Sequence, residues 1–136
     1  GKYTSPHFPQ AELMHALEVT KRMTICKQGF VDTMNMAKEG DVVYCDPPYL
    51  PLSETSNFVG YSKGGFPMEL QWSLAARAER LRDRVATVIV SNNDVPLARK
   101  MYAKADEIHE VQVAKRISCK GDGRKKSGEI IAVYRP

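Results

Sequence analysis

The chain lacks the cysteine and histidine patterns that a disulfide framework or a metal centre requires. Its three cysteines (Cys26, Cys45 and Cys119) are an odd number, lie far apart and form no CxxC pair. We therefore expect neither disulfides nor a zinc site. The three histidines are scattered without the spacing of metal ligands, so no metal is expected. Unpaired thiols of this kind suit the reducing cytoplasm.

Long hydrophobic runs are missing as well. The longest apolar stretches fall far short of the ~20 residues that a membrane-spanning helix needs. The chain also opens on polar residues, without the apolar segment of a signal peptide. No contact with a membrane is therefore expected, and 136 residues suit one domain with a single core.

Acidic residues are scarce near the end of the chain. The net charge is +4, and residues 115–136 contain seven lysines and arginines against two acids. A basic end of this kind suits a polyanion such as nucleic acid. The alternative is a solvated loop whose lysines only keep the chain soluble.

Apolar strand-like runs alternate with segments of helical spacing. The residue pattern predicts helices at 9–23, 31–40, 67–83 and 96–103, and strands at 23–30, 41–45, 85–90, about 108–113 and 129–135. This alternation predicts an α/β fold with a mostly parallel sheet that is covered on both sides. The last two strands have only a loop between them, so they are expected to form an antiparallel hairpin at one edge.

The apolar run DVVYC ends abruptly in Asp46-Pro47-Pro48-Tyr49. In open α/β sheets, ligands bind beyond the carboxyl ends of the strands, which is where this turn is expected. The two prolines have no N–H and cannot continue the strand pairing, yet their carbonyls still accept hydrogen bonds. The result is a rigid turn that presents a carboxylate, a carbonyl and a phenol ring.

These three groups suit an amino group on a flat heteroaromatic ring, whose lone pair is delocalised into the ring. Asp46 and the carbonyl of Pro47 can each accept one N–H and aim the lone pair at an electrophile, while Tyr49 stacks on the ring. Positioning and electrostatics then supply the catalysis without a nucleophilic side chain. The alternative is a turn that only terminates a strand.

Four stretches of the chain extend this pattern: FPQAELMHALE with ICKQGFVDTM, DVVYCDPPYLPLSETSNFVGYSKGGF, VIVSNND, and AKRISCKGDGRKKSGEIIAVYRP. In this order they resemble the segment upstream of the catalytic motif, that motif with its loop, the next strand and the closing hairpin of the Dam-type DNA adenine methylases. The resemblance implies S-adenosylmethionine as cofactor and duplex DNA as partner. It also implies the carboxyl-terminal part of a Rossmann-like methyltransferase fold.

The resemblance implies roles for individual residues. Asp46 and Tyr49 match the catalytic acid and the stacking ring, and Asp46 also lies against the cofactor. The turn at residues 29–32 takes the place that cradles the cofactor's adenine, with Phe30 as a ring contact. Asp32 is a second candidate there, or else only an acid at the N-terminus of a helix.

Two loops are expected to contact DNA. In the long loop at residues 50–66, Phe58 and Tyr61 are candidates to close over a flipped base, and the alternative is that both rings are tucked into the surface. In the basic loop near the end of the chain, the residues expected to touch phosphates are Lys120, Arg124, Lys125 and Lys126.

Several features of the family are absent from these 136 residues: the Gly-rich turn after the first strand, the acid that binds the cofactor ribose, and the target-recognition domain. Residues 1–136 are therefore expected to be a single partial catalytic domain, about half of a methylase. The strand order of the family implies that two missing strands would lie between 23–30 and 41–45. Because a strand edge would stay open, we expect the chain to self-associate. Because the Gly-rich turn and the ribose-binding acid are absent, we expect the chain to be inactive alone.

The resemblance implies methylation of the N6 amine of adenine at a specific site in duplex DNA, by base flipping. The recognition sequence GATC is implied by the family alone. Two other functions stay open: methylation of an RNA base or of another amine such as a glutamine side chain, and a non-enzymatic basic module that binds nucleic acid. An aspartate at position 46, rather than asparagine or serine, favours adenine.

Overall fold

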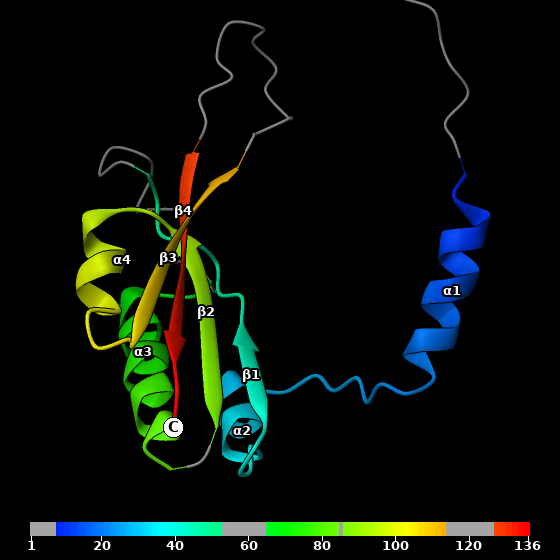
Figure 1. The fold of residues 1–136 in the computed structure, drawn as a ribbon, viewed down its shortest axis with the longest axis horizontal. Helices are drawn as coiled ribbons and strands as arrows, with labels where there is room; N and C mark the ends of the chain where they lie inside the picture. Colours follow the sequence, from blue (N-terminus) through cyan, green and yellow to red (C-terminus); the bar gives the residue numbers. More distant parts are fainter. Residues whose placement is uncertain (1–7, 53–64, 85, 114–126) are drawn as a thin grey trace, which may run out of the picture.

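The computed structural model describes residues 8–52, 65–84, 86–113 and 127–136. One sheet with helices packed on it forms the centre of this part of the chain (Figure 1). The elements in chain order are α1 (Gln10–Thr20), α2 (Phe30–Asn35), β1 (Val42–Cys45), α3 (Met68–Arg82), β2 (Thr87–Asn93), α4 (Pro96–Met101), β3 (Glu107–Val113) and β4 (Ser127–Tyr134).

The sheet has the strand order β1-β2-β4-β3. The pair β1–β2 is parallel, whereas β2–β4 and β4–β3 are antiparallel. The predicted antiparallel pairing of the last two strands is therefore confirmed, with β3 at the edge. The prediction of a mostly parallel sheet is wrong for the described residues, because only one of the three pairings is parallel.

The segment before α2 accounts for the difference. A strand was predicted at 23–30, yet residues 23–29 have no regular structure, and Ile25 is 83% exposed. Apolar residues form a stable strand only when a neighbouring strand satisfies their backbone, and no described strand lies beside this segment. On β1, Val42 and Tyr44 are 65% and 60% exposed. These two side chains lie on the face of β1 away from the helices, and the strand order makes β1 an edge strand of the described sheet.

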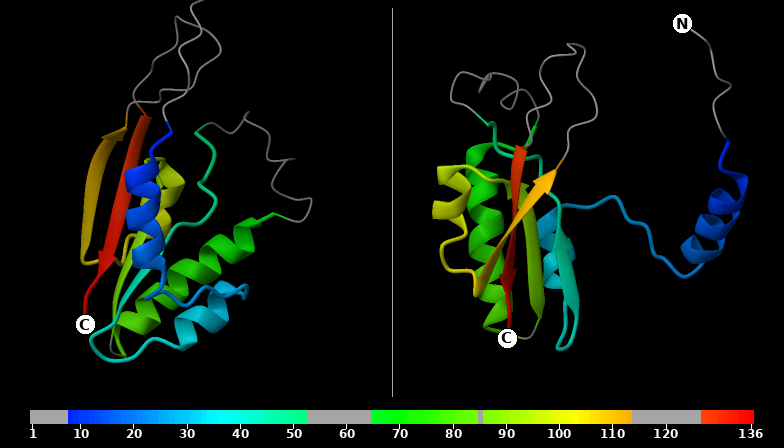
Figure 2. Two further views of the ribbon diagram at one scale, coloured as in Figure 1. Left: turned by 90° about the vertical axis from the view of Figure 1, so that its right-hand side faces the viewer. Right: turned by 45° about the horizontal axis from the view of Figure 1, so that its top comes forward.

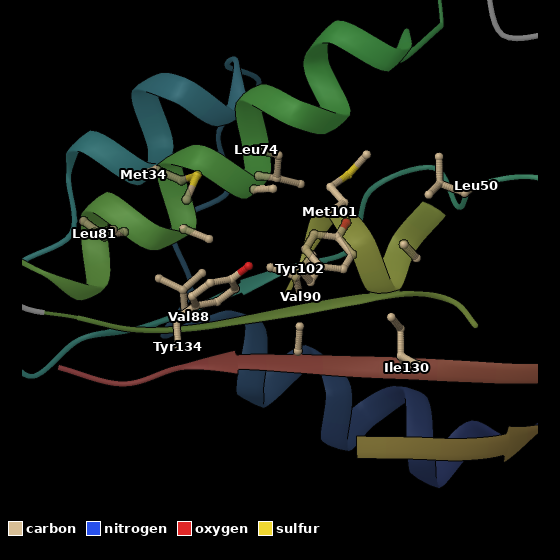
Figure 3. Packing of buried hydrophobic residues seen from close by; sticks show 14 of the residues in the cluster. Met34, Leu50, Leu74, Leu81, Val88, Val90, Met101, Tyr102, Ile130 and Tyr134 are labelled. Carbon is tan, nitrogen blue, oxygen red and sulfur yellow. The ribbon is translucent and has the colours of Figure 1, made fainter. Parts of the chain in front are cut away.

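Three helices bury one face of the sheet. Alternate residues of β2 and β4, among them Val88 and Tyr134, point toward α3, where Leu74 and Leu81 meet them (Figure 3). Side chains of α2 and α4 complete this core, whereas α1 stands apart from the sheet and buries no residue (Figure 2). The expectation of helices on both faces is therefore wrong for the described residues, since α2, α3 and α4 share one face.

The helices follow the predicted segments, with one exception. Residues 9–23, 67–83 and 96–103 contain α1, α3 and α4 as expected. By contrast, α2 ends at Asn35, well before the expected stop at Gly40. Gly40 has a positive φ of 83° and lies in the turn that leads into β1, so its left-handed backbone redirects the chain instead of ending a helix.

A pair of leucine variants tests this distribution of the core. Leu74 on α3 is 2% exposed, whereas Leu17 on α1 is 57% exposed. Leu74→Ala should lower the free energy of unfolding by about 2–5 kcal/mol, because it removes buried methyl groups and leaves a cavity. The matched control Leu17→Ala should change it by no more than about 0.5 kcal/mol. Urea denaturation at one fixed protein concentration measures the free energy of unfolding of both variants. An equal decrease in the two variants would contradict the finding that α1 contributes no residue to the core.

Candidate active site

The Asp46–Tyr49 turn lies at the carboxyl end of β1, beside the carboxyl end of β2. Cys45 is paired with Val90 in the parallel ladder, so the residues that follow each strand leave the same edge of the sheet. Asp46 is exposed, Pro47 is buried and Tyr49 is partly buried. The turn is thus anchored at its first proline while its carboxylate faces outward.

Two asparagines at the end of β2 hold the backbone of Leu50. Asn92 Oδ1 accepts a hydrogen bond from the Leu50 amide at 2.8 Å, and Asn93 Nδ2 donates to the Leu50 carbonyl at 2.6 Å. Asn92 is fully buried, and its Nδ2 donates to the Tyr102 hydroxyl at 3.1 Å. Each of these bonds contributes about 0.5–1.5 kcal/mol net to the free energy of unfolding. Removing one partner costs more, because it leaves a buried polar group without a hydrogen bond.

Helix α3 supplies a further contact to the turn. Gln71 is 1% exposed, and its Nε2 donates to the Pro48 carbonyl at 2.6 Å. Gln71 Oε1 is buried and has no hydrogen-bond partner among the described residues. By contrast, the Pro47 carbonyl accepts no hydrogen bond from the described residues. One carbonyl of the proline pair is therefore used for structure, and the other is left to accept a donor.

The carboxylate of Asp46 has one partner of its own. Ser91 Oγ lies 3.0 Å from Asp46 Oδ1, and no described residue donates to Asp46 Oδ2. Burial raises the pKa of the Tyr49 phenol, and a hydrogen bond with Ser91 partly opposes this rise. Burial also raises the pKa of the Cys45 thiol to about 11, so this thiol is protonated near neutral pH and does not act as a nucleophile.

A cavity of about 320 Å³ lies between β1 with the turn that follows it, α2 and the start of α3. Phe30, Met34, Phe66 and the segment from Val43 to Pro48 contribute to its walls. The rings of Phe30 and Phe66 meet at a centroid distance of 5.5 Å and an angle of 58°. The cavity therefore combines flat apolar walls with the carboxylate of Asp46.

The structure brings together some of the predicted site residues. Asp46, Pro47 and Phe30 share the cavity, and Tyr49 follows directly. Asp32 is exposed in the first turn of α2 and is not among the residues that line the cavity. The predicted DNA contacts lie outside the described residues: Phe58, Tyr61, Lys120, Arg124, Lys125 and Lys126.

Sequence reasoning missed the residues that hold the turn. Gln71 precedes Leu74 and Ala78 by three and seven positions, so it shares the buried side of α3, and a polar residue at that position was a usable signal. Ser91, Asn92 and Asn93 end a buried apolar strand, which was a second signal. Their partners are 23 to 46 residues away in sequence, so no local pattern indicates them.

Two other predictions can be compared with the described part of the chain. Within it, no helix is long and apolar enough to cross a membrane. The same residues contain no group of three His, Cys, Asp or Glu side chains that could hold a metal ion.

Comparison with known proteins identifies the family. A family model described as D12 class N6 adenine-specific DNA methyltransferase matches residues 1–117. The DNA adenine methylase of Escherichia coli (strain K12) is 43% identical over 136 residues, which are all of this chain and 49% of that protein. Those of Salmonella typhi and Vibrio cholerae serotype O1 are 41% and 37% identical, again over the whole chain and 49% of their own length.

The chain thus spans about half the length of the curated relatives it matches. The family model covers most of the chain and includes the Asp46–Tyr49 turn, β2 and the cavity beside β1. The chain therefore belongs to the D12 class of N6 adenine-specific DNA methyltransferases.

Proposed function

We propose that residues 1–136 are the carboxyl-terminal catalytic part of an enzyme that methylates the N6 amine of adenine in duplex DNA, with S-adenosylmethionine as the methyl donor. The observation that carries this proposal is the Asp46 carboxylate at the edge of the cavity beside β1, with Oδ1 bound to Ser91 and Oδ2 open to a donor among the described residues. Membership of the D12 class supports it. In this proposal the sheet is the carboxyl-terminal part of a Rossmann-like fold.

The residues of the turn act on the amine. Asp46 Oδ2 and the Pro47 carbonyl each accept one N–H, which draws the lone pair of the nitrogen out of the ring and toward the methyl group. Tyr49 stacks on the base, worth about 1–3 kcal/mol for a base on an aromatic ring. The positive charge that develops on the nitrogen lies beside the Asp46 carboxylate, which stabilises it, and the extra proton leaves afterward.

The cavity beside β1 fits part of the cofactor. Phe30 offers a flat apolar surface for an adenine ring, and the Asp46 carboxylate offers a partner for a positively charged group. The volume of the cavity, about 320 Å³, is at the lower end of the range of small-molecule binding sites, which is roughly 300–1,000 Å³. When bound, S-adenosylmethionine supplies an electrophilic methyl group on a sulfonium.

The substrate adenine must leave the helix, because its amine cannot reach a methyl donor while it is stacked. We therefore include base flipping in the proposal. GATC is proposed as the recognition sequence from the likeness to Dam-type methylases. The aromatic residues Phe58 and Tyr61 are proposed to contact the flipped base, and the basic loop is proposed to contact phosphates.

Residues 1–136 are also proposed to be a single partial domain. In the described sheet β1 is an edge strand, so a further strand can pair with its backbone. We propose that parts of an enzyme beyond these residues complete the cavity beside β1, which α2 and β1 line here. We propose that the chain alone self-associates through this edge and does not transfer methyl groups.

An aspartate variant tests the catalytic proposal in a hybrid enzyme, which joins the amino-terminal half of the Escherichia coli DNA adenine methylase to these 136 residues. Asp46→Ala should abolish N6 methylation, because the amine loses the acceptor that aims its lone pair, while duplex binding stays within about threefold. The control Asp83→Ala removes a surface carboxylate from the end of α3 and should keep full activity. Methyl transfer by the Asp46→Ala hybrid at a rate within tenfold of the unmodified hybrid would contradict the proposal. An unmodified hybrid that folds but transfers no methyl groups would also contradict it.

A salt titration tests the basic loop. Neutralising Arg124, Lys125 and Lys126 in the hybrid enzyme should weaken binding about equally for DNA with and without GATC, because phosphate contacts carry no sequence information. The slope of log K against log salt should flatten by up to roughly 0.9 for each phosphate that the variant no longer neutralises. An unchanged slope would contradict phosphate contacts and favour the alternative that this loop is only a solvated loop.

Sedimentation of the 136-residue chain tests the open edge. The chain should associate increasingly with concentration, because an unpaired parallel-sheet edge is a template for pairing. Val42→Lys, which places a charge at this edge, should shift the equilibrium toward monomer. A monomer at all concentrations would contradict association through this edge. A monomer that also binds S-adenosylmethionine in calorimetry at micromolar concentration would show that the site needs fewer additional parts than proposed.

A further inference from the structure

A cluster of hydroxyl groups lies at the ends of β1 and β2, and its centre is Ser91, which is 4% exposed. The Tyr44 hydroxyl lies 3.0 Å from Ser91 Oγ, and Ser91 Oγ lies 3.0 Å from Asp46 Oδ1. Tyr49 also forms a side-chain hydrogen bond with Ser91. One serine hydroxyl therefore contacts two phenols and the carboxylate of the turn.

Counting donors and acceptors fixes the direction of these bonds. A serine hydroxyl has one proton to donate and two lone pairs to accept with. An ionised carboxylate only accepts, so the Ser91 proton points to Asp46 Oδ1, and the Tyr44 phenol donates to Ser91 Oγ. The Cys45 carbonyl, 3.5 Å from Ser91 Oγ, is the competing acceptor and is the more distant one.

The strand geometry explains why these groups meet. Val90 points into the core, so the next residue of β2, Ser91, points to the opposite face. Tyr44 precedes Cys45 on β1 and points to that same face, away from the helices. The parallel register pairs Tyr44 with Ile89 and Cys45 with Val90, which brings Ser91 level with the start of the turn.

We propose that Ser91 is a positioning residue for the methyl transfer, a role that rests on the proposed function above. By donating to Oδ1, Ser91 fixes the rotation of the carboxylate and leaves Oδ2 to accept an amine N–H. The Tyr44 phenol in turn fixes the rotation of the Ser91 hydroxyl. The turn backbone is held separately by Asn92, Asn93 and Gln71, so the loss of Ser91 affects the aim of the carboxylate and leaves the turn in place.

Variants of Ser91 in the hybrid enzyme test this role. Ser91→Ala should lower kcat by roughly 10- to 100-fold, the effect of losing a hydrogen bond to a charged group, with KM for DNA within about threefold. Ser91→Thr keeps the hydroxyl and should restore kcat to within about threefold of the unmodified hybrid. The control is Ser73→Ala, which removes a serine hydroxyl from α3 and should keep full activity.

Two results overturn the positioning role while the proposed function stands: full kcat in Ser91→Ala, or an equal loss in Ser91→Thr. A readout that does not need activity is the titration of the Tyr49 phenol, followed by NMR with ring-labelled tyrosine. Because the hydrogen bond with Ser91 lowers the pKa of Tyr49, Ser91→Ala should raise this pKa. An unchanged Tyr49 titration overturns the cluster itself, whereas a folded but inactive unmodified hybrid overturns the proposed function alone.

Discussion

The parallel pairing of β1 with β2 is the constraint on which the rest of the site depends. Because the two strands run in the same direction, the turn after β1 and the polar end of β2 leave the sheet together. Asn92 and Asn93 then bind the two polar groups of the Leu50 backbone, and Ser91 binds Asp46. A turn that contains two prolines has few donors of its own, so its position is set by these side chains of the neighbouring strand.

The same sheet bears on the proposal that these residues are one part of a larger catalytic domain. Helices α2, α3 and α4 bury one face, and the antiparallel pair β3–β4 completes one side of the sheet. On the other side, β1 is an open edge, and the cavity that contains Asp46 lies along it. The residues that hold the Asp46 carboxylate and its turn therefore lie within these 136 residues, which span about half the length of the relatives they match.

Much of the fold could be predicted from the sequence where the signal is local. The apolar runs of β2 and β4 and the helical spacing of α3 depend on nearby residues, and these elements were predicted close to their bounds. The run around Ile25 has the same local signal, but a strand also needs a neighbour, and sequence spacing does not reveal whether one is present. The mostly parallel sheet was wrong for this reason.

The candidate site divides in the same way. The Asp46–Tyr49 turn could be recognised because its residues are consecutive and its prolines have a definite effect on the backbone. Ser91 and Gln71 act on the turn from 45 and 23 residues away, so their roles become visible only when the strands and helices are placed. The sequence shows a serine at the end of a strand and a glutamine on a helix. Both residue types are common at such positions, so neither predicts a contact with the turn.

The most direct test of this mechanism is a crystal structure of the hybrid enzyme with duplex DNA and a cofactor analogue that cannot transfer its methyl group. We expect the N6 amine of the flipped adenine to lie within about 3.2 Å of both Asp46 Oδ2 and the Pro47 carbonyl. We also expect Ser91 to keep its bond to Asp46 Oδ1. An amine that binds other groups, with Asp46 turned away from it, would contradict the central claim that the end of β2 aims this carboxylate at the substrate.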